Sequence, residues 1–227
     1  HYGANDAYFA TMVVIFVSVA SAATYLWEQW AEKQRRQCIE CKAHGVSATM
    51  VRATSPSILE GKLRGRQCKD VSRKGKFLWL TFENDTCLVI HFGMTGSLSV
   101  DGMKRLEYMD FKVDESWPPK YCKFEMVFDN SIKIAMTDAR RLGRVELVEH
   151  PNPLSVSPLN KLGNDPIEEP MSSERFSELI RKRGTTLKAL LLNQQMVYCG
   201  IGNCTLYHHS LCPLLTLTIH DRSFRAM

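Results

Sequence analysis

Alternating apolar and polar positions characterise residues 47–150 and predict β-strands. Ser47–Thr54 has strand composition, and the aromatic-rich run Val71–Glu83 is interpreted as one strand, because Phe and Trp favour pleated surfaces. After a turn at Asn84-Asp85, TCLVIHF is expected to pair back. Further strands are predicted in GMTGSLSV, in both halves of YCKFEMVFDNSIKIAMTD and in GRVELVEH. The pattern indicates an antiparallel β-sandwich, with a short helix or loop at SPSILEGKLRGR.

Residues 172–203 change to a helical period. SSERFSELIRKR predicts a helix with Ser172 or Ser173 as its N-cap, and TTLKALLLNQQ predicts a second helix capped by Thr185. A proline-rich linker, residues 151–171, separates these helices from the strands. The fold class is therefore α+β, with a sheet domain followed by a short helical module.

The run from Ala7 to Trp27 carries no charged residue. It is long enough to cross a bilayer as one helix, and aromatic residues lie at both of its ends. It is interpreted either as a membrane anchor or as an unrelated start joined to the domain. Residues 1–46 are accordingly taken as an atypical N-terminal segment, and residues 204–227 as an atypical tail.

The composition is that of a globular protein, because 44% of the 227 residues are hydrophobic and 23% are charged. A solenoid or low-complexity chain is excluded, since the sequence contains no internal repeat. The net charge of +5 suits a polyanion such as DNA or a membrane surface, although solubility explains it equally well.

Eight cysteines are scattered along the chain, and only Cys38-Ile-Glu-Cys41 has the spacing of a metal or redox pair. A structural zinc site needs four ligands, and a second such pair is missing from the sequence. His208, His209 and Cys212 are the other potential ligands, but they lie far away along the chain. The pattern favours free thiols in a reducing compartment, without a metal or cofactor.

Four further stretches combine in one order and spacing: RKGKFLWL (Arg73–Leu80), HFGMTGSL (His91–Leu98), TDARRLGRV (Thr137–Val145) and LLLNQQMVYCGIGN (Leu190–Asn203). Together they resemble the formamidopyrimidine-DNA glycosylase family, which includes the endonuclease VIII-like enzymes. The linker and WPPKYCKFEMVFDN are similar to its plant and fungal branch. The resemblance implies a glycosylase-type sheet domain at 47–150 and part of a helix–two-turn–helix DNA-binding module at 172–203.

The resemblance implies that damaged double-stranded DNA is the partner. A base must be extruded from the duplex before it can be excised, which costs a few kcal/mol, and side chains fill the gap. By resemblance these plug residues are Met94, Arg140 and Leu142. The family has an aromatic residue at the third position, so the leucine is a departure that removes stacking.

DNA contacts are implied at five positions by the same resemblance, four of them with phosphates. Lys76 and Arg141 match cations that hold the DNA backbone, and Arg140 contacts DNA as a plug residue. GIGN is expected to form a turn in which Gly202 lets the backbone approach a phosphate closely and Asn203 adds a donor. His91 lies near the plug, and a structural role is favoured for it.

The resemblance implies a DNA glycosylase/AP lyase of base excision repair that excises oxidised purines, such as formamidopyrimidine and 8-oxoguanine. The nucleophile of the family is the amine of an N-terminal proline followed by glutamate, and strand nicking proceeds by β,δ-elimination. This sequence starts His1-Tyr2 and has its first proline at Pro56, so no catalytic residue is assigned.

The alternative hypothesis is a catalytically inactive DNA-binding or membrane-anchored remnant of that family. By family function we expect a nuclear or organellar protein that acts as a monomer. Membrane association is expected in addition if residues 7–27 are a genuine anchor. An unrelated membrane protein is a third possibility, and it predicts no DNA binding.

Overall fold

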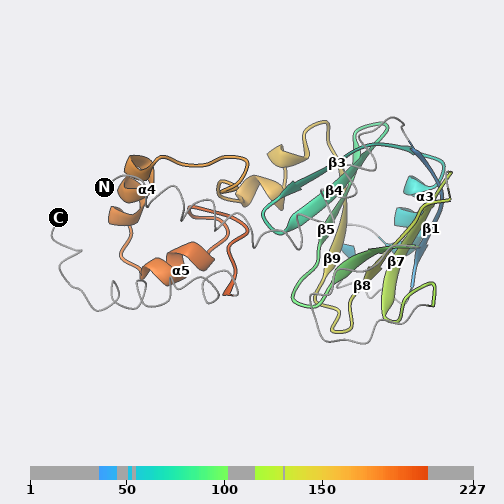
Figure 1. Cartoon of the computed structure of the whole chain (residues 1–227). Coiled ribbons are helices and arrows are strands. Elements are labelled where there is room, and N and C mark those ends of the chain that lie inside the picture. Colours follow the sequence, from blue (N-terminus) through green and yellow to red (C-terminus); the bar gives the residue numbers. More distant parts are fainter. Residues whose placement is uncertain (1–35, 45–50, 53–54, 102–115, 130, 204–227) are drawn as a thin grey trace. The chain divides into compact units, whose positions relative to one another are not determined.

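The computed structural model describes residues 36–44, 51–52, 55–101, 116–129 and 131–203 (Figure 1). Contacts divide them into two units. The β unit contains the described parts of 36–73 and 77–156, and the C-terminal unit contains 74–76 and 157–203. Within the described ranges, no helix combines the length and apolarity needed to span a membrane. The apolar run 7–27 and the tail 204–227 lie outside these ranges.

The strands of the β unit follow the order β2-β9-β5-β4-β3-β1-β7-β8-β6. Their bounds are β1 (Arg36–Ala43), β2 (Val51–Arg52), β3 (Gln67–Lys74), β4 (Phe77–Phe82), β5 (Thr86–His91), β6 (Ser97–Val100), β7 (Cys122–Phe128), β8 (Lys133–Thr137) and β9 (Arg144–Glu149). The registered pairs are antiparallel except β2–β9, which is parallel. The predicted antiparallel sheet is confirmed.

Strand β1 connects two layers of the sheet (Figure 1). Its first residues, Arg36 and Gln37, pair with β3, whereas Cys38–Ala43 pair with β7. The register with β7 shifts between Cys38 and Glu40, just after the strand has passed from one neighbour to the other. No strand was predicted before Ser47, because RQCIECKA mixes charged and apolar residues without a strict alternation.

The core of the β unit lies around β4 and β5. Every residue of β5 from Thr86 to Ile90 is buried, so this strand is covered on both faces. The helix α3 (Pro56–Leu63) begins at Ser55, whose hydroxyl accepts a hydrogen bond from the Ile58 amide, and it buries Leu59 and Leu63. Of the two possibilities left open for SPSILEGKLRGR, a helix or a loop, the structure has the helix over Pro56–Leu63.

The single strand predicted over Val71–Glu83 is wrong, because the chain turns after Lys74 and β4 begins at Phe77. Gly75 adopts φ +57, and a Cβ there would lie 2.9 Å from the side chain of Cys199. The positive φ and the close approach both favour glycine. The predicted turn at Asn84-Asp85 is confirmed, with φ values of 57 and 54.

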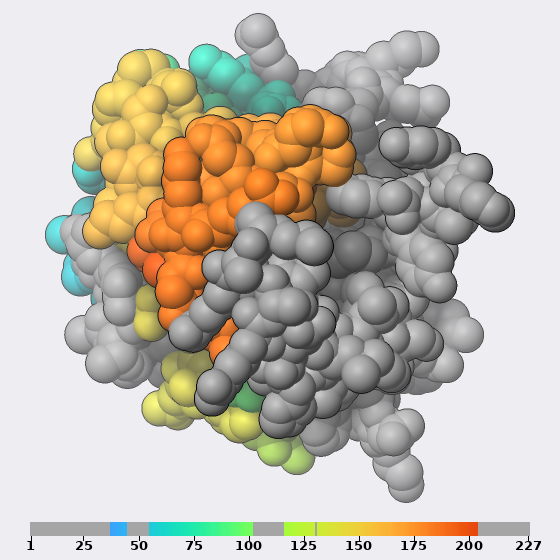
Figure 2. All heavy atoms as spheres, turned by 90° about the vertical axis from the view of Figure 1, so that its left-hand side faces the viewer, coloured from blue at the N-terminus to red at the C-terminus, as the bar shows by residue number. Residues whose placement is uncertain are grey.

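The C-terminal unit contains the 3-10 helix η2 (Leu159–Lys161), α4 (Ser173–Arg181) and α5 (Leu187–Leu192). Ser172 or Ser173 was predicted to cap α4, and the structure has Ser172. The cap of α5 is Thr186 and not Thr185, because the Thr186 hydroxyl accepts the hydrogen bond from the Ala189 amide. Figure 2 shows α4 and the preceding chain (orange) facing the viewer.

The core of this unit is a separate apolar cluster, composed of Leu190, Leu191, Val197, Tyr198 and Ile201. Phe176 of α4 packs on it and stacks with Tyr198 at 5.8 Å between ring centroids. Burial of Ile201 therefore fixes the middle of the GIGN turn.

Candidate DNA-binding site

Met94 lies at the tip of the turn between β5 and β6, and its side chain is 74% exposed. The turn is held by its backbone: Gly96 N–H donates to the Phe92 carbonyl at 2.9 Å. Gly93 adopts φ +64, and a Cβ there would lie 2.7 Å from the carbonyl carbon of Leu142. The turn therefore packs directly against the loop that contains Leu142.

That second loop joins β8 to β9 and contains the other proposed plug residues. Arg140 and Arg141 are exposed, and Arg141 adopts φ +56, which is uncommon for a residue with a side chain. Leu142 is 47% exposed although it is apolar. The structure thus brings Met94, Arg140 and Leu142 together on two adjoining loops of the β unit.

Asp138 joins the two loops and is fully buried. Its Oδ1 accepts hydrogen bonds from the Thr95 hydroxyl at 2.7 Å and the Arg140 amide at 3.2 Å. Its Oδ2 accepts from the Gly143 amide at 2.6 Å. Hydrogen bonds to a carboxylate are stronger than those between neutral groups, and these satisfy both of its oxygens. This role was not predicted from the sequence, although an acidic residue two positions before a pair of arginines, at a strand end, is a detectable signal.

His91 supports the Met94 turn from its base. Its Nδ1 accepts from the Gly93 amide at 3.1 Å, and its ring lies 4.7 Å from that of Phe77. These contacts agree with the structural role favoured for this histidine.

The GIGN turn lies in the C-terminal unit together with Lys76. The Nζ of Lys76 donates to the Ile201 carbonyl at 3.0 Å. A Cβ on Gly202 would lie 3.4 Å from the same Nζ, and Asn203 is exposed. Lys76 and the turn, 125 residues apart in the sequence, thus form one cluster.

Gln194 shapes the GIGN turn from inside. Its Nε2 donates to the Ile201 carbonyl at 2.8 Å, and its Oε1 accepts from the Gly200 amide at 2.7 Å. Gly200 adopts φ +92, which only glycine does without strain. Sequence reasoning treated Gln194 as part of a helix and missed this contact.

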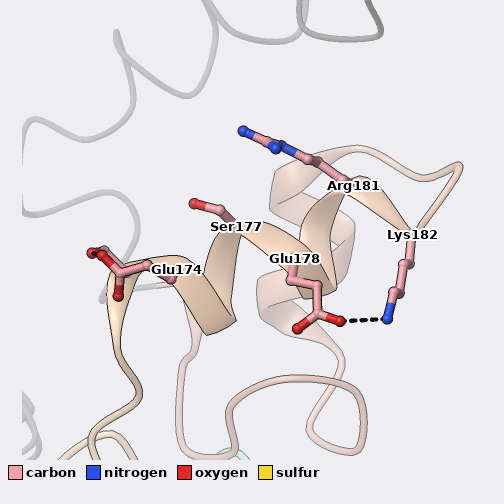
Figure 3. Close-up of a pocket in the computed structure, with 6 residues that line it drawn as sticks. Glu174, Ser177, Glu178, Arg181 and Lys182 are labelled. Atoms are coloured by element: carbon pink, nitrogen blue, oxygen red, sulfur yellow. Dashed lines mark hydrogen bonds and ion pairs between the residues drawn. The ribbon is translucent and has the colours of Figure 1, made fainter. Parts of the chain in front are cut away.

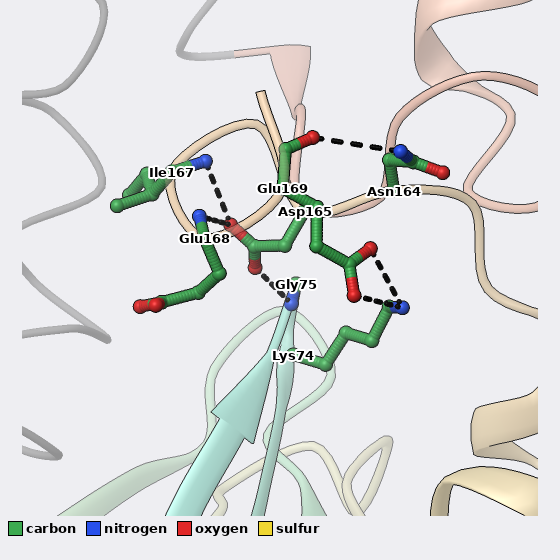
Figure 4. A network of polar contacts seen from close by, with 7 residues as sticks. All are labelled: Lys74, Gly75, Asn164, Asp165, Ile167, Glu168 and Glu169. Atoms are coloured by element: carbon green, nitrogen blue, oxygen red, sulfur yellow. Dashed lines mark hydrogen bonds and ion pairs between the residues drawn. The ribbon is translucent and has the colours of Figure 1, made fainter. Parts of the chain in front are cut away.

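A second buried carboxylate fixes the β3–β4 turn through Gly75, the residue before Lys76 (Figure 4). Asp165 is 2% exposed, and its Oδ2 accepts from the Gly75 amide at 2.7 Å. Its Oδ1 accepts from the Ile167 amide at 3.0 Å and the Glu168 amide at 3.4 Å. Lys74 adds an ion pair with Glu169 at 3.1 Å.

Comparison with known proteins identifies the family. The profile described as "Formamidopyrimidine-DNA glycosylase N-terminal domain" matches residues 22–145. The chain belongs to this family. The matched range includes β1 and both loops of the proposed plug.

Among relatives, the formamidopyrimidine-DNA glycosylase of Arabidopsis thaliana is 36% identical over 173 residues, which are 74% of this chain and 44% of that protein. The one from Mycobacterium leprae (strain Br4923) is 27% identical over 165 residues, which are 71% of this chain and 54% of that protein. The chain thus spans about half the length of the glycosylases that it matches.

Solved structures share the fold. A Lactococcus lactis formamidopyrimidine-DNA glycosylase bound non-covalently to DNA with an AP site has a TM-score of 0.65 at 24% identity, over 84% of this chain and 65% of that chain. MutM in complex with DNA containing carbocyclic 8-oxo-G has a TM-score of 0.65 at 22% identity, over 89% of this chain and 76% of that chain. At these identities the likeness shows the glycosylase fold.

The buried cysteines of this chain lie in its hydrophobic core. Burial raises the pKa of the Cys38 thiol to about 11, and it raises the pKa of Cys41 further. A thiol with a raised pKa is a poor nucleophile and metal ligand at neutral pH. Across the described ranges, no cluster of three or more His, Cys, Asp or Glu side chains is arranged to hold a metal.

A shallow recess of about 510 Å³ lies along the outer face of α4 (Figure 3). It is lined by Ser173, Glu174, Ser177, Glu178, Arg181 and Lys182. All of these belong to the polar side of one helix, and none is a residue that the family resemblance assigns to DNA. The recess is therefore separate from the candidate site.

Proposed function

We propose that this protein is a DNA glycosylase and AP lyase of base excision repair that acts on oxidised purines in double-stranded DNA. The observation that carries the proposal is the pairing of the Met94 turn with the Arg140 loop in a member of the formamidopyrimidine-DNA glycosylase family. The two loops present a flexible thioether, a guanidinium and an apolar side chain, which suit insertion into a base stack.

Phosphate binding is proposed for the cluster of Lys76, Gly202 and Asn203, with Arg141 of the β unit as a further clamp. The Lys76 ammonium lies beside Gly202, where the absence of a side chain lets a phosphate approach the backbone. Such contacts hold the DNA backbone without reading its sequence. The place of action is then the nucleus or a DNA-containing organelle.

The proposed chemistry starts with attack of a proline α-amine on C1′ of the damaged nucleotide. The bond from C1′ to the base breaks and the base leaves with a proton; the C1′–O4′ bond of the sugar then opens, O4′ takes a proton, and a Schiff base forms. Proton abstraction at C2′ then expels the 3′ phosphate. An α-amine has a pKa of about 8, so part of it is unprotonated at neutral pH. Pro56 is the first proline in the sequence, and it lies inside the chain at the start of α3. Its nitrogen is an amide without nucleophilic character, so Pro56 is not assigned this role. Binding without excision is kept as the second candidate.

Borohydride trapping on duplexes with 8-oxoguanine or an abasic site tests the proposal. A covalent protein–DNA adduct is expected of the lyase. Salt-sensitive binding without an adduct would support the second candidate instead. Absence of binding to either duplex would contradict both.

Lys76→Ala tests the phosphate cluster, and Lys182→Ala of α4 is its control. Both variants remove one positive charge from the C-terminal unit, and the Lys182 ammonium forms an ion pair with Glu178 of the same helical segment. We expect about tenfold weaker duplex binding for Lys76→Ala and a change below about twofold for the control. Equal effects of the two variants would show that only net charge matters.

A further inference from the structure

The Asp138 carboxylate accepts hydrogen bonds from its own loop and also from a second loop. A carboxylate at a strand end commonly accepts from amides a few residues further on, as Asp138 does from Arg140 and Gly143. Its bond to Thr95 is different, because Thr95 lies 43 residues away on the other loop. One buried group thus ties both loops to the end of β8.

Thr95 also contacts Arg140, a side chain that we propose to contact DNA. Its hydroxyl donates to Asp138 Oδ1 at 2.7 Å and accepts from Arg140 Nε at 3.5 Å. A hydroxyl has one donor and two acceptor positions, so both contacts are made together. The guanidinium of Arg140 is therefore oriented by the residue next to Met94.

We propose that Asp138, acting through Thr95, is a positioning residue that aligns Met94 and Arg140 for entry into one gap in the base stack. This proposal rests on the proposed DNA function. Base extrusion costs a few kcal/mol, and side chains ordered beforehand lose less entropy when they fill the gap. The alignment therefore acts on recognition of the lesion and leaves phosphate binding unaltered.

The backbone supports the same coupling. A Cβ on Gly93 would lie 2.7 Å from Leu142, and a Cβ on Gly143 would lie 3.1 Å from Asp138 Oδ2 and 3.2 Å from the His91 carbonyl. The loops are in contact over these glycines, so a displacement of one moves the other. The Thr95 bond then selects one arrangement of the two side chains.

Thr95→Val removes the hydroxyl while keeping the shape of the side chain, and Thr95→Ser restores it. Ser97→Ala is the matched control, because the Ser97 hydroxyl bonds Thr137 at 2.9 Å close to the same turn and does not contact Asp138. Each variant of the full chain is compared on two duplexes, one intact and one with a tetrahydrofuran abasic analogue opposite 2-aminopurine. Fluorescence reports unstacking of the 2-aminopurine, and titration gives the two affinities.

For Thr95→Val we expect about tenfold lower preference for the abasic duplex and a smaller rise in fluorescence, with affinity for the intact duplex within about twofold of the wild type. Thr95→Ser and Ser97→Ala are expected to behave as the wild type. The proposal is overturned if Thr95→Val weakens both duplexes equally or if the serine variant fails to restore the preference, because both results indicate general destabilisation.

Amide hydrogen exchange in the free protein separates this inference from the proposed function. Thr95→Val is expected to speed exchange at the amides of Arg140 and Gly143, which lie on the other loop. Unchanged exchange there would refute the coupling, whatever the DNA results. If the wild type does not distinguish the two duplexes, the proposed function fails, and faster exchange at these amides would still support the coupling of the loops.

Discussion

Two buried carboxylates organise the two units in the same way but serve different kinds of side chain. Asp138 gathers a hydroxyl and two amides in the β unit, and Asp165 gathers three amides in the C-terminal unit. The side chain that the first group presents most openly is Met94, which is 74% exposed. The second group presents Lys76, whose ammonium is bonded to the Ile201 carbonyl.

This difference follows from what each side chain is proposed to do. A plug residue has to leave the protein surface and enter the base stack, so it cannot be covered at rest. A cation that meets a phosphate can stay in the surface, and an internal hydrogen bond lowers the entropy that it loses on binding. At Met94 the hydrogen bonds therefore fix the backbone of the turn and leave the side chain exposed. At Lys76 a hydrogen bond fixes the side chain itself.

Removing the carboxylates gives the largest expected effect. Asp138→Ala leaves two amides and a hydroxyl without their acceptor, and Asp165→Ala leaves three amides, so each is expected to lower the free energy of unfolding by about 3 kcal/mol. Urea denaturation measures this, with Ser97→Ala as a control below about 1 kcal/mol. A loss below 1 kcal/mol for either Asp variant would break the equivalence of the two groups.

The turn glycines distinguish the two regions next. Gly93→Ala places a Cβ 2.7 Å from Leu142 at φ +64, and we expect a loss of about 2 kcal/mol in stability together with lower preference for abasic DNA. Gly75→Ala, with a contact of 2.9 Å to Cys199 at φ +57, should instead weaken binding to any duplex.

Gly184→Ala is the control for both glycine variants, because no atom lies within 4 Å of a Cβ at Gly184. Its unfolding free energy should stay within about 0.5 kcal/mol of the wild type. If Gly93→Ala and Gly75→Ala both change the preference for abasic DNA, or both change the affinity for any duplex, the two regions do not have the different roles proposed here.

The salt dependence of binding sharpens the comparison further. Lys76→Ala should reduce the slope of log K against log salt by about 1, because one phosphate contact is lost. Met94→Ala should leave this slope unchanged and lower only the preference for the abasic duplex. Titrations at several salt concentrations measure both, and a changed slope for Met94→Ala would place that residue among the phosphate contacts.

The smallest expected effect concerns pH. Burial raises the pKa of Cys38 in the β unit and of Cys199 in the C-terminal unit from 9.0 to about 11. Because the folded state holds these protons more tightly, the stability is constant below pH 9 and falls as the pH rises toward 11. Between pH 8 and 10 each thiol should contribute a loss of about 1 kcal/mol.

Urea denaturation at pH 8 and 10 measures this loss, and Cys38→Ala and Cys199→Ala should each reduce it. Alkylation of the folded protein at pH 8 should be about a hundredfold slower than that of a free thiol. Fast labelling of either cysteine would show that its side chain reaches solvent.

The sequence predicted the elements whose signals are local. An apolar run after a turn identified β5, alternation identified the β7–β8 hairpin, and a serine before a helical period identified α4. The turn at Gly75 was missed because the aromatic run after it is as strand-like as the chain before it. The shift from Thr185 to Thr186 reflects two adjacent threonines, between which tertiary packing decides.

For the site, the family pattern supplied the side chains that are proposed to contact DNA, and the structure supplied those that hold them. Asp165 and Gln194 contact residues that are distant in sequence or bend the chain locally, and one sequence has no pattern for such contacts. The same holds for the hydrogen bond of Asp138 with Thr95, which lies 43 residues away. The clustering of Lys76 with Ile201 is of this kind, since 125 residues separate them. Roles carried by long-range hydrogen bonds therefore required coordinates.

The grouping of residues 74–76 with the C-terminal unit has a consequence for protein engineering. A gene fragment that starts at residue 157 encodes α4, α5 and the GIGN turn. It lacks the Gly75 amide, which donates to Asp165, and the Lys76 ammonium, which donates to the Ile201 carbonyl. The helical module is consequently not a transplantable part. A graft onto another scaffold would have to bring along a three-residue hairpin tip from the middle of the strand-rich half.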